Sequence, residues 1–218
     1  MERHFDQELE DLKQELLRMA GQAEQNVAQA LKALTQRDDA LAQQVIAADA
    51  VLDQFEIDID DRVIKLLALW QPTAKDLRFI TMAMKISSEL ERVGDQAVSI
   101  AHRAIELNKE AALKPLVDIP RMAEQAQGMI RDSLSAFVYG KTELARDVIQ
   151  RDARIDMLNQ QLHRELTSFM IEDPHTITRA LNLMTVSRKL ERIADHATNI
   201  AEEVVYLYEA RDIRHPSA

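Results

Sequence analysis

The chain of 218 residues contains no cysteine, and only four glycines and five prolines interrupt it. The absence of cysteine excludes disulfide bonds, thiolate zinc sites and cysteine nucleophiles, so any metal ion must be bound through oxygen or imidazole. Glycine and proline are the residues that break helices, and the remainder is rich in Ala, Leu, Glu, Gln, Arg and Lys. We therefore expect an all-α protein with almost no sheet.

Long apolar runs are also missing. Residues Met1 to Asp6 lack the apolar core of a signal peptide, and no stretch reaches the roughly 18 apolar residues of a membrane span. We expect a cytoplasmic protein that meets the membrane only through partners. The formal net charge of -10 repels phosphate backbones, so no nucleic-acid binding is expected.

The second half of the sequence resembles the first. Residues 90–101 read LERVGDQAVSIA and residues 190–201 read LERIADHATNIA, with seven identities in twelve positions. Nearer the start of each half the offset is 103 rather than 100, so the second half lacks three residues in one loop. Such self-similarity indicates two copies of one structural unit.

Each half contains three segments with the apolar periodicity of a helix. In the first half they cover about 9–34, 40–70 and 73–108, and breaks at Gly140 and Pro174 divide the second half in the same way. The short links between segments make consecutive helices antiparallel. Each half is therefore predicted to be a three-helix bundle.

The expected boundaries follow from caps and connections. Asp38 and Thr73 are candidate N-caps of the second and third helices. A proline-containing stretch connects the halves, which gives repeats at 1–112 and 113–218. The sequence thus predicts six long helices in two tandem bundles related by a pseudo-twofold axis, with a frayed tail after Arg211.

Paired acidic residues are the candidate chemistry. Two carboxylates four residues apart share one helix face and repel each other, yet the chain holds ten such pairs, so the spacing alone says little. Only four pairs recur at equivalent positions of both halves. They form a first carboxylate set of Asp49, Asp53, Glu91 and Asp95, and a second carboxylate set of Asp152, Asp156, Glu191 and Asp195.

Hairpin geometry strengthens this prediction. In an antiparallel helix pair, residues lie level when they are equally far from the turn, and Asp53 and Glu91 each lie 19 residues from Pro72. Asp49 and Asp95 each lie 23 residues from it, so the four carboxylates fall within about one turn of the same height. The residues of the second set are spaced in the same way around the junction of Asp173 and Pro174.

Four carboxylates beside an apolar seam raise each other's pKa or require a compensating positive charge. Oxygen ligands favour Mg, Mn or Fe, with Ca or Zn less favoured, and we predict that both sets bind metal. His163, His196 and Asn159 are candidates for an auxiliary role. A different interpretation is an interhelical network in which Lys85, Arg92 or Arg192 neutralises the acids.

These motifs also resemble a known family. The phrases QPTAKDLR at 71–78, LERVGD at 90–95 and LERIADHATNIAE at 190–202 are similar to signatures of the PhoU family of phosphate-signalling regulators. The resemblance implies two three-helix bundles, multinuclear metal sites on both carboxylate sets, and a homodimer. It further implies a negative regulator that links the ATPase subunit of the phosphate transporter to a PhoR-type sensor histidine kinase. Gln96, Ser99 and Gly94 depart from His196, Asn199 and Ala194 of the second repeat, so the two sites need not be equivalent.

Two other interpretations remain open from the residues. Carboxylate-rich bundles also house metalloenzymes, either hydrolases or oxidases, although the Glu-x-x-His pattern of the oxidases occurs only at Glu172 to His175, where Pro174 interrupts it. We predict no enzymatic activity. The chain could also be a plain helical scaffold in which metal is incidental.

Overall fold

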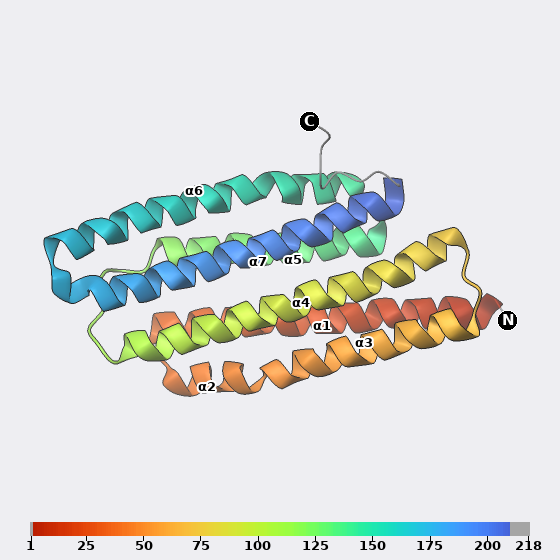
Figure 1. The fold of residues 1–218 in the computed structure, drawn as a ribbon, viewed down its shortest axis with the longest axis horizontal. Helices are drawn as coiled ribbons and strands as arrows, with labels where there is room; N and C mark the ends of the chain where they lie inside the picture. Colours follow the sequence, from red (N-terminus) through yellow and green to blue (C-terminus); the bar gives the residue numbers. More distant parts are fainter. Residues whose placement is uncertain (1, 210–218) are drawn as a thin grey trace.

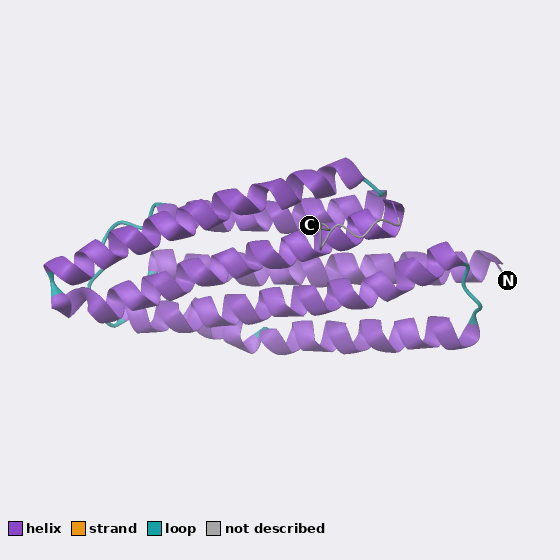
Figure 2. Ribbon diagram, turned by 45° about the horizontal axis from the view of Figure 1, so that its top comes forward, coloured by secondary structure: helices purple, strands orange, loops and turns teal. Residues whose placement is uncertain are grey.

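The computed structural model describes residues 2–209, and the regular elements in this range are helices (Figures 1 and 2). The predicted tail after Arg211 lies outside the described residues. The elements in chain order are α1 (Glu2–Gln36), α2 (Asp39–Ala47), α3 (Asp49–Leu69), α4 (Ala74–Asn108), α5 (Asp118–Tyr139), α6 (Thr142–Glu172), the short 3-10 helix η1 (Pro174–Thr176) and α7 (Ile177–Glu209).

The predicted class is confirmed, with one difference in the first repeat. The second predicted helix is interrupted at Ala48, whose N–H is shared between the carbonyls of Gln44 and Val45, and this divides it into α2 and α3. The equivalent helix of the second repeat, α6, is continuous. Ala48 lies among good helix formers, so the sequence contains no signal for the break.

The predicted caps hold in position but differ in detail. Asp38 is the N-cap of α2, and its carboxylate accepts a hydrogen bond from the N–H of Leu41 at 3.0 Å. Thr73 is the N-cap of α4, but its hydroxyl donates to the carboxylate of Asp76 at 2.6 Å rather than capping the backbone. Gly140 ends α5 with φ 66°, a left-handed conformation that suits glycine.

The helices form two antiparallel bundles lying side by side (Figures 1 and 2). One contains α1 to α4 and the other α5 to α7, and α4 packs against α7 between them. These two central helices run in opposite directions, as do α1 and α5, which is the arrangement that a pseudo-twofold axis produces (Figure 1).

Apolar side chains at the predicted seams fill the core. Leu52, Ile59 and Leu66 of α3 are buried against α4, where Leu90 and Val93 are also buried. Phe79 of α4 stacks on Phe137 of α5 with ring centroids 5.0 Å apart, which joins the two repeats. Side-chain burial of this extent is the main source of stability for long helices.

Trp70 closes the outer end of the first bundle. Its ring lies 5.5 Å from that of Phe5 and 5.8 Å from that of His4, measured between centroids. None of the helices within residues 2–209 is both long and apolar enough to cross a membrane.

Candidate metal centres

The first carboxylate set lies where α3 packs against α4. Asp49 begins α3 and Asp53 follows one turn later, whereas Glu91 and Asp95 occupy the middle of α4. Burial, followed by the charges of Asp95 and Glu56, raises the pKa of Glu91 to about 7, and Asp53 and Asp49 act in the same direction. Burial and the charges of Asp53 and Asp95 raise the pKa of Asp49. All four predicted carboxylates are therefore close enough to interact.

The second carboxylate set lies between α6 and α7 in the same manner. Burial, then the charges of Asp156 and Asp195, raises the pKa of Asp152 to about 6. Burial, then Glu191 and Asp156, raises the pKa of Asp195. The hairpin geometry thus brings together four carboxylates in each repeat, at the cost of repulsion between like charges.

The carboxylates are gathered but do not form a ready-made cage. Within residues 2–209, no three side chains of the Asp, Glu, His or Cys types converge tightly enough to hold an ion. Asp152 nevertheless has its Oδ1 atom buried with no hydrogen-bond partner among the described residues. A buried carboxylate oxygen without a partner is energetically unfavourable, and a hard cation would satisfy it. In the second carboxylate set, the orphaned oxygen of Asp152 therefore fits a divalent ion with oxygen ligands.

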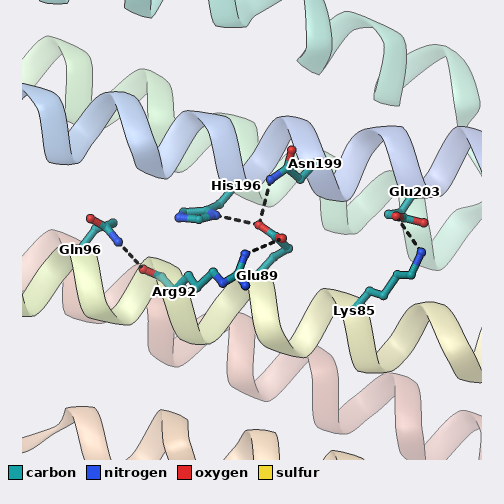
Figure 3. Close-up of polar contacts among 7 residues, drawn as sticks. All are labelled: Lys85, Glu89, Arg92, Gln96, His196, Asn199 and Glu203. Atoms are coloured by element: carbon teal, nitrogen blue, oxygen red, sulfur yellow. Dashed lines mark hydrogen bonds and ion pairs between the residues drawn. The ribbon is translucent and has the colours of Figure 1, made fainter. Parts of the chain in front are cut away.

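The nearby cations are paired elsewhere. Lys85 donates to Glu203 at 3.0 Å, and Arg92 lies 3.5 Å from Glu89 (Figure 3). Arg192 is the exception, because its positive charge opposes the rise in the pKa of Asp195. Burial and the neighbouring acids have larger effects on that pKa. A carboxylate and arginine network therefore does not account for the first carboxylate set.

The two histidines named from the sequence make their hydrogen-bond contacts outside the two carboxylate sets. Nδ1 of His196 lies 2.7 Å from Oε2 of Glu89, and Asn199 donates to the same oxygen at 3.1 Å (Figure 3). Nε2 of His163 lies 3.4 Å from the carbonyl of Met184. His196 thus belongs to the contact between α4 and α7.

Sequence reasoning missed Glu89, which anchors a polar seam between α4 and α7. Burial works against its charge, but hydrogen bonds from His196 and Asn199 hold the pKa of Glu89 below its usual range. Lys189 is the repeat equivalent of Glu89, and Gln96 is the repeat equivalent of His196. The equivalent contact is also present, because Lys189 donates to Gln96 at 3.1 Å. The opposite charges of Glu89 and Lys189, at equivalent positions, are the feature of the sequence that could have indicated this seam.

Both repeats match a known protein family. The PhoU domain model matches residues 16–104 and again 119–204. The PhoU homolog of Pseudomonas putida, described as a phosphate-specific transport system accessory protein, is 42% identical over 212 residues, which covers 97% of this chain and 83% of the relative. The homolog from Aquifex aeolicus, described in the same words, is 44% identical over 208 residues, covering 95% and 94%.

Solved structures agree. The crystal structure of PhoU from Pseudomonas aeruginosa has a TM-score of 0.91 at 41% identity and covers 95% of this chain and 100% of that one. The phosphate transport system regulatory protein PhoU from Streptococcus pneumoniae has a TM-score of 0.90 at 29% identity, covering 97% and 100%.

Fold and site together define a tandem-repeat helical protein with one carboxylate set in each repeat. The chain belongs to the PhoU family. This family consists of accessory and regulatory proteins rather than enzymes, so the prediction of no enzymatic activity is confirmed and the metalloenzyme alternative is no longer supported.

Proposed function

We propose that this chain is a cytoplasmic, metal-binding regulator that restrains phosphate uptake and the phosphate-starvation response. It links the ATPase subunit of a phosphate ABC transporter to a PhoR-type sensor histidine kinase. The observation that carries this proposal is the similarity to phosphate-specific transport system accessory proteins along nearly the whole chain.

Metal binding is the part of the proposal that the carboxylates support. Asp49, Asp53, Glu91 and Asp95 would hold ions in the first repeat, and Asp152, Asp156, Glu191 and Asp195 in the second. The proposed ions are Mg, Mn or Fe in multinuclear sites, because a donor set made only of carboxylate oxygens suits hard cations, whereas Zn more often takes His or Cys ligands. A bound cation supplies positive charge that removes the repulsion between the acids, so it stabilises the packing of each hairpin.

Exposed apolar side chains on α3 support a surface for partners. Ile57, Ile64 and Leu69 are 55%, 59% and 77% exposed. The equivalent positions of α6 carry Gln160, Thr167 and Glu172, so these three apolar positions are not repeated, although α6 exposes Met157 and Ile171 at other positions. Unpaired apolar surface of this kind is typical of interaction sites, including those of a homodimer.

Co-purification tests the proposed role. We expect the tagged chain to retain the transporter ATPase subunit and the sensor kinase from the same organism, with association that depends on phosphate supply. Ile57→Ser with Ile64→Ser should weaken at least one of these complexes, or the homodimer measured by light scattering. Met157→Ser, an exposed position on α6, is the matched control. Association with neither protein would contradict the role.

One double variant distinguishes the metal-dependent role from that of a plain scaffold. Glu91→Ala with Glu191→Ala removes a carboxylate from each set, and we expect it to lower both metal content and signalling. If metal is lost while partner binding and signalling are unchanged, metal is incidental and the protein acts as a plain scaffold.

A further inference from the structure

The contact between α4 and α7 has two ends related by the pseudo-twofold axis, and the two ends differ in charge. At the end drawn in Figure 3, cations meet acids, because Lys85 pairs with Glu203. Glu89 likewise contacts both Arg92 and His196. All of these residues except His196 line a groove of about 370 Å³. This end is therefore held by contacts between opposite charges.

The other end of the contact carries cations in place of those acids. The repeat offset of 100 residues places Lys189 where the first end has Glu89, and Arg103 where it has Glu203. With two exposed arginines of α7 they form a cationic cluster, made of Arg103, Arg188, Lys189 and Arg192. Within residues 2–209 none of the four forms an ion pair, although the chain carries a formal net charge of -10.

Two hydrogen bonds between α4 and α7 fix the geometry of the cationic cluster. Lys189 donates to Gln96 at 3.1 Å, and Arg103 donates to Asn182 at 3.1 Å. In each helix the two residues are seven apart, which places them on one face about 10 Å from each other. Ser99 lies between them on α4, half-buried, and its hydroxyl makes no hydrogen bond to any described residue. The two hydrogen-bonded pairs therefore bracket a hydroxyl that is available to a ligand.

Arg103 has a second unsatisfied donor. Its Nε atom is buried and has no hydrogen-bond acceptor among the described residues. A buried donor without an acceptor is unfavourable, and more so when the group is charged. The acceptor that a guanidinium N–H binds most strongly is an anionic oxygen. A bound oxyanion would therefore satisfy Arg103.

The cationic cluster is also compact. Burial is the largest cause of the lowered pKa of Lys189, and the charge of Arg192 comes next. Arg103 and Arg188 lower this pKa further, whereas Asp95 acts in the opposite direction. All three arginines thus lie within electrostatic reach of one ammonium group, and a bound anion would relieve the repulsion between them.

We propose that the cationic cluster binds a small oxyanion of the phosphate class, either free phosphate or a phosphate monoester. Guanidinium groups bind two phosphate oxygens at once, and the ammonium group of lysine adds a point charge. A compact group of four cations suits a small multivalent anion better than an extended acidic chain. This site goes beyond the regulatory role proposed above, and it requires neither metal in the carboxylate sets nor a partner protein.

Equilibrium dialysis against labelled inorganic phosphate tests the proposal on the full chain. Metal ions are first removed with a chelator, which is then dialysed away, so that no metal binds the phosphate. We expect saturable binding of one phosphate per chain. Arg192→Gln should lower the affinity by about tenfold, because it removes a charged hydrogen-bond donor. Arg103→Gln should do the same, although its amide can still donate to Asn182.

Arg92→Gln is the matched control, because it removes the same charge at the equivalent position of the other end, where Arg92 lies beside Glu89. We expect it to change the phosphate affinity by about twofold or less, since a distant exposed charge is screened by water and salt. Circular dichroism verifies that each variant remains helical.

Unlabelled competitors distinguish the two sources of the anion. Glycerol phosphate that displaces the label as well as phosphate does would identify a monoester site, and weaker displacement would identify a site for the free anion. Chloride at the same ionic strength should displace neither. No saturable binding, displacement by chloride, or equal effects of Arg92→Gln and Arg192→Gln would overturn the proposal. Each of these results would leave the proposed metal binding and partner binding unaffected.

Discussion

Gly94 of α4 lies against α3 beside the first carboxylate set. A Cβ atom at this position would collide with Cδ1 of Leu52, a fully buried side chain, and would also approach a carboxylate oxygen of Asp49 at 3.5 Å. The second repeat has Ala194 here, so the two hairpins are packed differently.

Replacing Gly94 by alanine should therefore destabilise the protein. Overpacking costs about 1–3 kcal/mol, and the better helix propensity of alanine returns up to about 1 kcal/mol, so we expect a net loss of about 1 kcal/mol in urea denaturation. Gly21→Ala is the control, because a Cβ at Gly21 meets nothing within 4 Å. It should stabilise α1 slightly, and equal stability of the two variants would contradict the close packing.

Glu91 should make the metal-free protein sensitive to pH. Its pKa of about 7 lies above the ordinary value of 4.5, so the folded state holds a proton that the unfolded state has already released. This contribution to stability is complete below pH 4.5 and is lost as pH rises through 7. Glu91→Gln removes the titration and should be more stable than the unaltered protein at pH 8, by about 1 kcal/mol after allowance for solvent screening.

Thermal unfolding between pH 5 and pH 8, with chelator present, measures this effect. The stability gained by Glu91→Gln should grow as pH rises. Glu106→Gln, at an exposed position of the same helix, should give no such trend. A gain that stays constant with pH would contradict the raised pKa of Glu91.

Among the elements, the pair α4 and α7 holds the repeats together. Residues pair in opposite order along them, from Lys85 with Glu203 to Arg103 with Asn182, as antiparallel helices require. Glu89 is the centre of this seam, since its carboxylate accepts from both His196 and Asn199.

Glu89→Ala should loosen the seam by leaving His196 and Asn199 without their acceptor. Loss of a charged hydrogen-bond partner at a partly buried site costs about 1–3 kcal/mol, and we expect that decrease in the free energy of unfolding. His102→Ala, at an exposed position of α4, should change stability by less than about 0.5 kcal/mol. Comparable effects of the two substitutions would mean that the polar seam contributes little.

The helices were predictable where periodicity and breakers agree, as at Asp38, Thr73 and Pro174. Equal spacing from the turn also predicted which carboxylates of each hairpin lie near one another, because helix geometry is regular. The break at Ala48 was not predictable, since the alanines at 47, 48 and 50 favour a helix and no glycine or proline lies there. The contact of His196 with Glu89 was also missed, because sequence periodicity says which face is buried but not which helix covers it.

On the scale of the whole molecule, the two central helices carry both the seam and half of each carboxylate set. Glu91 lies two residues after Glu89, and Asp195 directly precedes His196. A cation bound in either repeat would therefore act on a helix that also contacts the other repeat. The pseudo-twofold arrangement places one carboxylate set in each bundle.

Equilibrium metal analysis tests the central claim, that the two carboxylate sets bind metal. Protein freed of ions is dialysed against Mn²⁺ and its bound metal is measured per chain. We predict stoichiometric metal in the unaltered protein, partial loss when Glu91 and Asp95 are both replaced by alanine, and complete loss when Glu191 and Asp195 are replaced as well. A chain that binds no stoichiometric metal, or a fourfold variant that binds as much as the unaltered protein, would contradict metal binding by the two carboxylate sets.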